Sequence, residues 1–87
     1  MIREYLGDYP RIKVLEFLIY NKDHAYGIRE ILIMAGVKHR NLIKILDDLL
    51  DKDMVYIESK KGKSHLYRIH EFHPFISSLI LAMEVVE

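Results

Sequence analysis

Hydrophobic residues crowd one helical segment near the start of the chain, residues 11–20. Only Arg11, Lys13 and Glu16 are clearly polar in this segment, so we expect its helix to be covered on most sides and to lie at the centre of the core. Asp8 and the proline two residues later predict where this helix begins, because aspartate caps free backbone amides and proline is tolerated in the first turn.

Two further segments, residues 27–34 and 38–50, place apolar residues on one helical face, and Gly36 lies between them. Glycine ends a helix in the left-handed conformation at no steric cost, which predicts a tight turn between the two helices. The apolar face of the second helix consists of Leu42, Ile45, Leu46 and Leu49. Before the first of these helices, residues 24–26 are expected to form a short edge strand.

After these helices the hydrophobic period changes to two, which predicts a β-hairpin from residues 54–58 and 64–69 around a loop that contains Gly62. The inward side chains are expected to be Val55, Ile57, Tyr67 and Ile69, and the outward ones Tyr56, Leu66 and Arg68. A last helix, opened by a proline, is predicted over residues 74–86. The expected fold is therefore α+β and mainly α, in the order helix, helix, turn, helix, hairpin, helix.

Length and composition favour a single small domain. The chain has 87 residues, 51% of them hydrophobic, and no cysteine, so it has neither a disulfide nor a thiolate ligand for a metal. A reducing compartment suits such a chain, and a cytoplasmic location is the default expectation. The amino-terminal residues lack the apolar run of a signal peptide, and the most apolar stretch, residues 75–86, is shorter than the ~20 residues of a membrane span. No membrane partner is therefore expected.

Residues 28–47 have the pattern of a helix-turn-helix, in which two helices cross closely and the second exposes a face to the major groove of DNA. The positions expected to be buried hold Ile31, Ala35, Val37, Leu42 and Ile45. Leu32 is a departure, because alanine is usual at that position, and it predicts a wider crossing of the helices. Any helical hairpin with a glycine turn has the same pattern, so the elements that follow it are more informative.

Three helices followed at once by a hairpin with a basic tip are the element order of a winged helix. The residues that carry this similarity are Leu6-Gly7-Asp8, Pro10-Arg11, Val14-Leu15, Ala35-Gly36-Val37, and Gly62 with Tyr67-Arg68-Ile69. On these residues the chain resembles, over nearly its whole length, the small winged helix-turn-helix regulators common in archaea, of the broad ArsR and MarR-like class. The resemblance implies a DNA-binding domain in residues 1–73. ArsR-type sensors typically bind metal through cysteines, so metal sensing is not expected here.

The thirteen basic and thirteen acidic residues give a net charge of zero, but they are unevenly distributed. No acid interrupts residues 36–44 or residues 59–69, and the expected fold brings the basic residues of these two segments onto one face. Several acids lie toward the other end of the second helix: Asp47, Asp48, Asp51 and Asp53. Duplex phosphates favour such a basic face because binding releases counterions. A solvated, lysine-rich turn is the alternative interpretation.

We expect duplex DNA to contact this face at Lys38, His39, Arg40, Asn41, Lys44, Lys60, Lys61, Lys63 and Arg68. Arg40 is the best candidate for recognising guanine, because its forked donors pair with two acceptors at once. His39 and Asn41 are expected to donate to phosphates or bases, and Ile43 either touches a thymine methyl group or packs under the wing. The lysines of the hairpin tip are expected to contact phosphates or a minor groove, positioning the protein more than specifying sequence.

Neither catalysis nor a cofactor is expected. His70 and His73 lie three residues apart with Glu71 between them, but the spacing is not that of a metalloprotease helix and no third ligand is identifiable. The chain has no glycine-rich phosphate loop, nucleophile elbow or acid–base pair. The leading hypothesis is a DNA-binding transcriptional regulator, whose small-molecule effector, if it has one, the sequence does not identify. The alternative is a winged-helix protein-interaction module in a replication or transcription assembly.

The last helix has more apolar surface than one small domain covers easily. Its broad apolar arc consists of Phe75, Ile76, Leu79, Ile80, Ala82, Met83 and Val86, with Leu81 and Val85 apart from it. We therefore expect residues 74–87 to form a homodimer interface at Phe75, Ile76, Leu79, Ile80, Met83 and Val86. A two-fold dimer favours a palindromic site with half-sites ~34–36 Å apart. The alternative is a monomer in which this helix folds back over residues 11–20.

Overall fold

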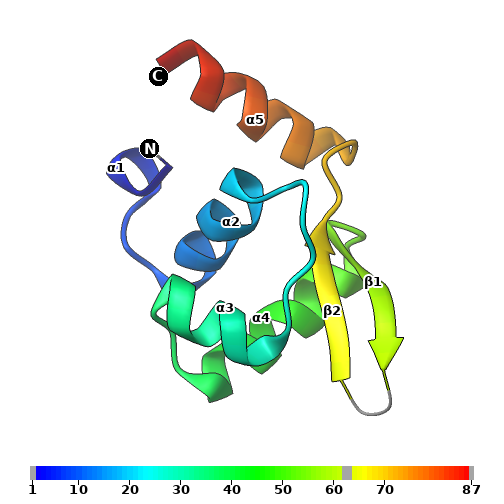
Figure 1. Cartoon of the computed structure of the whole chain (residues 1–87). Coiled ribbons are helices and arrows are strands. Elements are labelled where there is room, and N and C mark those ends of the chain that lie inside the picture. The colour runs from blue at the N-terminus through cyan, green and yellow to red at the C-terminus, as the bar shows by residue number, and fades with distance from the viewer. Residues whose placement is uncertain (1, 62–63, 87) are drawn as a thin grey trace.

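The structure consists of helices and a β-hairpin that lies at one side of the molecule (Figure 1). The computed structural model describes the backbone of residues 2–61 and 64–86 and the side chains of residues 2–60 and 64–84. Its elements are α1 (Ile2–Leu6), α2 (Pro10–Tyr20), α3 (Ile28–Ala35), α4 (His39–Asp51), β1 (Val55–Lys61), β2 (Ser64–Ile69) and α5 (Pro74–Val86). The fold is α+β and mainly α, as predicted, and its element order is compatible with a winged helix. None of the described helices is long and apolar enough to cross a membrane.

The central helix is α2, as its dense hydrophobic pattern predicts. Its apolar residues Val14, Leu15, Leu18 and Ile19 are each at most 5% exposed. Contacts with α1, α3, α4 and β2 account for this burial. In Figure 1, α2 lies between α5 above it and α3 and α4 below it. The other elements therefore pack around a helix that has almost no face suited to water.

The start of α2 differs from the prediction. Tyr9 rather than Asp8 is the N-cap residue, its side chain makes no capping hydrogen bond, and Pro10 begins the helix. The Asp8 carboxylate instead lies 3.3 Å from the guanidinium of Arg3. The predicted cap at Asp8 is wrong because this cation competes for the carboxylate. Proline begins the helix without a cap, since its φ angle already suits a helix and it has no N–H to satisfy.

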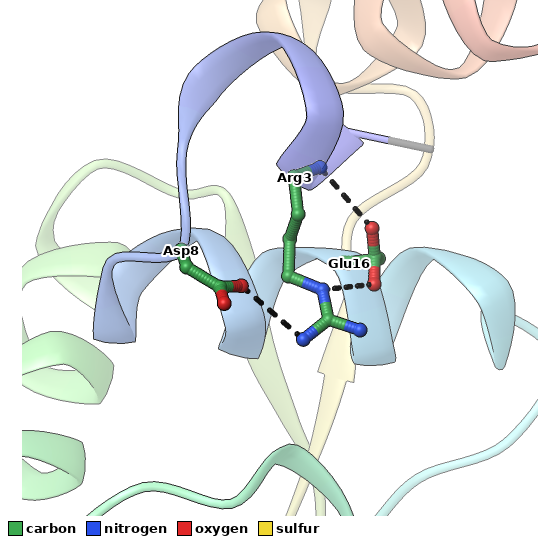
Figure 2. A network of polar contacts seen from close by, with 3 residues as sticks. All are labelled: Arg3, Asp8 and Glu16. Carbon is green, nitrogen blue, oxygen red and sulfur yellow. Dashed lines mark hydrogen bonds and ion pairs between the residues drawn. The ribbon is translucent and has the colours of Figure 1, made fainter.

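A buried carboxylate fastens α1 to α2. Glu16 is only 6% exposed, and Figure 2 shows it facing Arg3. Arg3 donates to it twice, from Nε to Oε1 at 2.9 Å and from the backbone N–H to Oε2 at 3.3 Å. These charge-assisted hydrogen bonds satisfy a carboxylate that would otherwise be costly to bury. Hydrophobic spacing does not reveal α1, because the helix has five residues and buries Ile2 alone.

A tight turn at Gly36 joins α3 to α4, as predicted. Gly36 has φ +69° and ψ +45°, the left-handed conformation that glycine adopts most easily. Its N–H donates to the Leu32 carbonyl at 3.0 Å and closes the last turn of α3. The chain then enters α4, whose inner face has residues at most 7% exposed: Leu42, Ile45, Leu46 and Leu49. The opposite face of α4 is left toward solvent.

The hairpin packs its inner face on the helices. It is antiparallel, with Val55 opposite Ile69. These two residues and Tyr67 are at most 7% exposed, which confirms the predicted inner face. The edge strand predicted over residues 24–26 is reduced to one bridge, in which Tyr26 and Tyr67 exchange two backbone hydrogen bonds of 2.8 Å. This bridge ties β2 to the segment between α2 and α3.

The last helix, α5, has the bounds predicted from the sequence. Ile76 and Met83, at 0% and 7% exposure, belong to the same core cluster as Leu18 of α2 and Ile69 of β2. In Figure 1, α5 lies at the end of the molecule opposite the hairpin tip. The helix therefore closes the core on one side.

An ion-pair network joins α2 to the far end of α4. Arg11 Nη1 lies 2.6 Å from Asp48 Oδ2, and Lys52 Nζ lies 2.9 Å from the same oxygen. Hydrogen bonds from Lys52 and from Arg11 lower the pKa of Asp48 from its usual value of 3.8, against a small opposing effect of burial. The folded state therefore favours the ionised carboxylate.

Replacing Asp48 with asparagine is expected to flatten the acid side of the stability profile. Since folding depresses the pKa of Asp48, its charge stabilises the fold above about pH 4, and this contribution is lost as the pH falls through the folded-state pKa. Urea unfolding between about pH 6 and pH 2.5 measures the effect. Asp51→Asn is the control, because the exposed Asp51 has no ion pair with the described residues. An Asp48→Asn profile as steep as that of the wild type would contradict the expectation.

Candidate nucleic-acid interface

The start of α4 presents the side chains that the sequence predicts to meet DNA. The N-cap residue of this helix is Lys38, whose side chain makes no capping hydrogen bond. All five predicted residues are exposed: Lys38, His39, Arg40, Asn41 and Lys44. They face solvent because the leucines and isoleucines of the opposite face fill the core. Ile43 is half-buried between the two faces.

The charges of α4 oppose its helix dipole. Arg40 and Lys44 lie near its start, whereas Asp47, Asp48 and Asp51 lie near its end. The reverse order stabilises a helix, because the partial charge of the backbone is positive at the start and negative at the end. Within the described part of the chain, neither Arg40 nor Lys44 has an ion pair that would offset the repulsion. The start of α4 therefore combines uncompensated cations with free backbone N–H groups.

The hairpin adds one described lysine to the predicted surface. Lys60 is exposed on β1, opposite His65 of β2. The side chain of Lys61 and all of Lys63 lie outside the described residues, so these two contacts remain sequence predictions. In Figure 1, the start of α4 and the outer ends of β1 and β2 lie toward the lower end of the molecule, and α5 lies at the upper end. Two distant basic segments thus share one end of the fold.

Arg68 differs from the other predicted DNA contacts because its guanidinium already has two partners. Its Nε donates to the Lys22 carbonyl at 2.8 Å, and its Nη1 donates to Glu58 Oε1 at 2.7 Å. Its side chain is only 25% exposed. The hydrogen bond to Glu58 raises the pKa of Arg68 above its usual value, despite an opposing effect of burial. The sequence misses this pairing, because Glu58 and Lys22 are brought to Arg68 by tertiary structure.

His70 and His73 have no third metal ligand beside them. Nδ1 of His73 accepts the backbone N–H of Phe75 at 3.1 Å, and the two imidazole centroids are 6.5 Å apart. No group of three or more His, Cys, Asp or Glu side chains within the described residues could hold a metal ion. A surface cavity of about 400 Å³ lies next to His70 and is lined by Tyr56, Arg68, Ile69, His70, Glu71 and Phe72.

The predicted dimer surface on α5 is divided between core and solvent. Ile76 and Met83 fill the core of the single chain and leave little surface for a partner, so their predicted place in a dimer interface stays a prediction. Leu79 and Ile80 are half-buried against the same core. The arc predicted from the helical projection is wide enough that its middle packs inward and only its edges face solvent. The side chain of Val86 lies outside the described residues.

Several apolar side chains remain exposed toward the upper end of Figure 1. Phe75 and Leu81 of α5 are 52% and 60% exposed, and Tyr5 and Leu6 of α1 are 68% and 46% exposed. Helix α1 and the last turns of α5 lie near one another at this end (Figure 1). Leu81 is therefore exposed as well, on the side of α5 that the helical projection sets apart from the arc. This surface lies at the opposite end of the molecule from the hairpin tip.

No protein family, curated protein or solved structure matches this chain. The interpretation of the interface therefore depends on the charge, exposure and packing of its own residues. Among these, the start of α4 is the strongest indication of an anionic ligand, because Arg40 and Lys44 are exposed cations at the positive end of a helix.

Arg40→Glu is expected to stabilise the free protein. The substitution replaces a cation in the first turn of α4 with an anion, which the dipole favours by about 0.3–1 kcal/mol at low salt. Thermal unfolding at low and high salt measures the gain, which should shrink as salt screens the charges. Lys44→Glu, beyond the first turn of the same helix, should gain less. A loss of stability in Arg40→Glu would contradict the proposed conflict between charge and dipole.

Proposed function

We propose that this protein is a transcriptional regulator that binds duplex DNA sequence-specifically in the cytoplasm, in the manner of the small archaeal regulators it resembles. Helix α4 would enter the major groove, and the wing, residues 55–69, would contact phosphates or the minor groove. The observation that carries the proposal is the uncompensated positive charge at the start of α4. This arrangement weakens the free helix and suits a polyanion.

Duplex DNA explains this arrangement better than a small anion does. The basic side chains of α4 stand on an exposed, convex helix face rather than in a pocket, and an α-helix fits the major groove. Exposed Arg40 has no partner among the described residues, so its forked donors are available to the base edges of guanine. At functional sites, proteins retain residues that destabilise the free protein, and the bound ligand compensates for the lost stability.

The acidic half of α4 supports one orientation on DNA. Asp47 and Asp51 are exposed at the end of the helix away from Arg40. Their charges would be repelled by phosphates, so the start of the helix faces the duplex and the end does not. This agrees with recognition helices, which use residues of their amino-terminal part to contact bases.

A homodimer through α5 and α1 is part of the proposal. Its support is the exposed apolar surface that includes Phe75 and Leu81, since such surfaces mark association sites and a two-fold axis gives a closed assembly. This surface lies at the end of the molecule opposite the hairpin tip, so a partner there would leave both wings free (Figure 1). The resulting pair of recognition helices would favour a palindromic site.

The second candidate function is a protein-interaction module. Its support is the pair Ile33 and Met34 on α3, which are 72% and 66% exposed beside the turn into α4. Exposed apolar side chains at this position suit a protein partner better than DNA. Binding to duplex DNA distinguishes the two functions. Retention on duplex DNA at low salt that is lost steeply as salt rises supports the regulator, and no binding at about 50 mM salt favours the module.

Arg40→Ala is expected to weaken binding to the preferred duplex by about 1–3 kcal/mol and to relax preference at one base pair. Selection from a random DNA library supplies that duplex, and fluorescence anisotropy on preferred and random sequences measures both effects. Arg29→Ala removes another exposed arginine, from α3, and should leave the sequence preference unchanged. Equal weakening of Arg40→Ala on all sequences would make Arg40 a phosphate contact.

Leu81→Glu is expected to convert a dimer to a monomer without unfolding it. Leu81 is exposed in the single chain, so a charge there disrupts a partner contact and not the core. Light scattering at micromolar concentration should give twice the chain mass of 10.4 kDa for the wild type and the single mass for the variant. Ile33→Glu on α3 is the control and should stay dimeric. A monomeric wild type would rule out the dimer and its palindromic site.

A further inference from the structure

One arginine links three segments at the base of the wing. Arg68 lies on β2 opposite Tyr56 of β1. Its Nε holds the carbonyl of Lys22 in the turn after α2, at 2.8 Å, and its Nη1 holds the carboxylate of Glu58 on β1, at 2.7 Å. Bonds through two nitrogens of one planar guanidinium restrict both distance and angle. The two strands and the helical core are therefore joined at one point.

The position of Glu58 is set by an irregularity in the sheet. Ile57 pairs with Tyr67 and Ser59 pairs with Leu66, so Glu58 has no residue opposite it. Such a bulge redirects a side chain and increases the local twist of the strand. Here the redirected carboxylate of Glu58 accepts a hydrogen bond from Arg68. The bulge and the arginine together fix the Glu58 carboxylate beside β2.

Other attachments of the wing lie on both sides of Arg68 along the hairpin. Val55 and Ile69 are buried at its base, and Tyr26 and Tyr67 exchange their two backbone hydrogen bonds. Arg68 adds a side-chain hydrogen bond from the wing to the helical core, at the Lys22 carbonyl. Beyond the bridge at Tyr67, the described parts of β1 and β2 pair with each other. Loss of the Arg68 hydrogen bond would therefore leave the wing less well oriented.

We propose that Arg68 is a positioning residue that sets the orientation of the wing, and not a phosphate contact. The inference rests on the proposed function, in which the wing meets DNA. A phosphate at Arg68 would have to approach the carboxylate of Glu58, which already occupies Nη1, and like charges repel. The exposed Lys60, farther along β1, has no such competitor among the described residues.

The salt dependence of duplex binding separates these roles. A phosphate contact contributes about 0.9 to the slope of log affinity against log salt. Arg68→Met should lower the slope by more than this, approaching the loss caused by replacing Lys60, Lys61 and Lys63 together with alanine. Adding Arg68→Met to that triple variant should change affinity by less than about twofold, because the contacts it positions are already gone.

Arg68→Lys distinguishes charge from geometry. Lysine keeps the charge but lacks the planar fork, so a positioning role predicts that this variant behaves like Arg68→Met. An Arg68→Lys slope equal to that of the wild type would overturn the proposal. A loss of only about 0.9 in the Arg68→Met slope, additive with the loss in the triple lysine variant, would also overturn it. A slope unchanged in both variants would also overturn it and reduce Arg68 to a contributor to stability. Lys22→Met is the control, since only the backbone carbonyl of Lys22 is used and that bond remains.

Amide hydrogen exchange in the free protein tests the inference separately from DNA binding. Arg68→Met and Arg68→Lys should speed exchange at the amides through which β2 pairs with β1, such as that of Leu66, by about tenfold, with α2 amides unchanged. If the wild type does not bind duplex DNA, the proposed function fails while this measurement still decides whether Arg68 holds the wing. Unchanged exchange in both variants would overturn the positioning role.

Discussion

The need to cover α2 on all sides is the constraint on which the rest of the structure depends. Residues such as Val14 and Leu18 are at most 1% exposed, and α1, α3, α4 and β2 all contact the helix that carries them. Both α4 and β2 contact this one helix. The basic start of α4 and the wing are therefore mounted on a common support, and their relative position does not depend on the loops between them.

Some arginines of this chain join elements of the fold, and others are exposed without a partner among the described residues. The chain has five arginines. Arg3 joins α1 to α2, Arg11 joins α2 to α4, and Arg68 joins the wing to the turn after α2. Arg29 and Arg40, on α3 and α4, are exposed and have no partner in the part of the chain that is described. The arginines without a structural task thus lie on the two helices of the predicted helix-turn-helix.

Most of the fold is predictable from local patterns, and most of the errors involve contacts between distant segments. The turn at Gly36, the hairpin and α5 follow from spacing and turn residues close together in sequence. The cap expected at Asp8 fails because Arg3 takes its carboxylate, and Arg68 is occupied by partners 10 and 46 residues away. The projection of α5 identifies its apolar arc, but it does not divide that arc between the core, where Ile76 lies, and the surface.

Charge separation along α4 has a kinetic consequence for the proposed DNA complex. A chain of zero net charge is not drawn to a duplex by its total charge. The cations near Arg40 and the acids near Asp51 instead give it an electric dipole, which turns in the field of the phosphates before contact. At physiological salt the field of the phosphates extends only ~8 Å. Within that distance the start of α4 would turn toward the duplex first. The protein would be oriented before it touches the duplex, and it would dissociate quickly after a collision in another orientation.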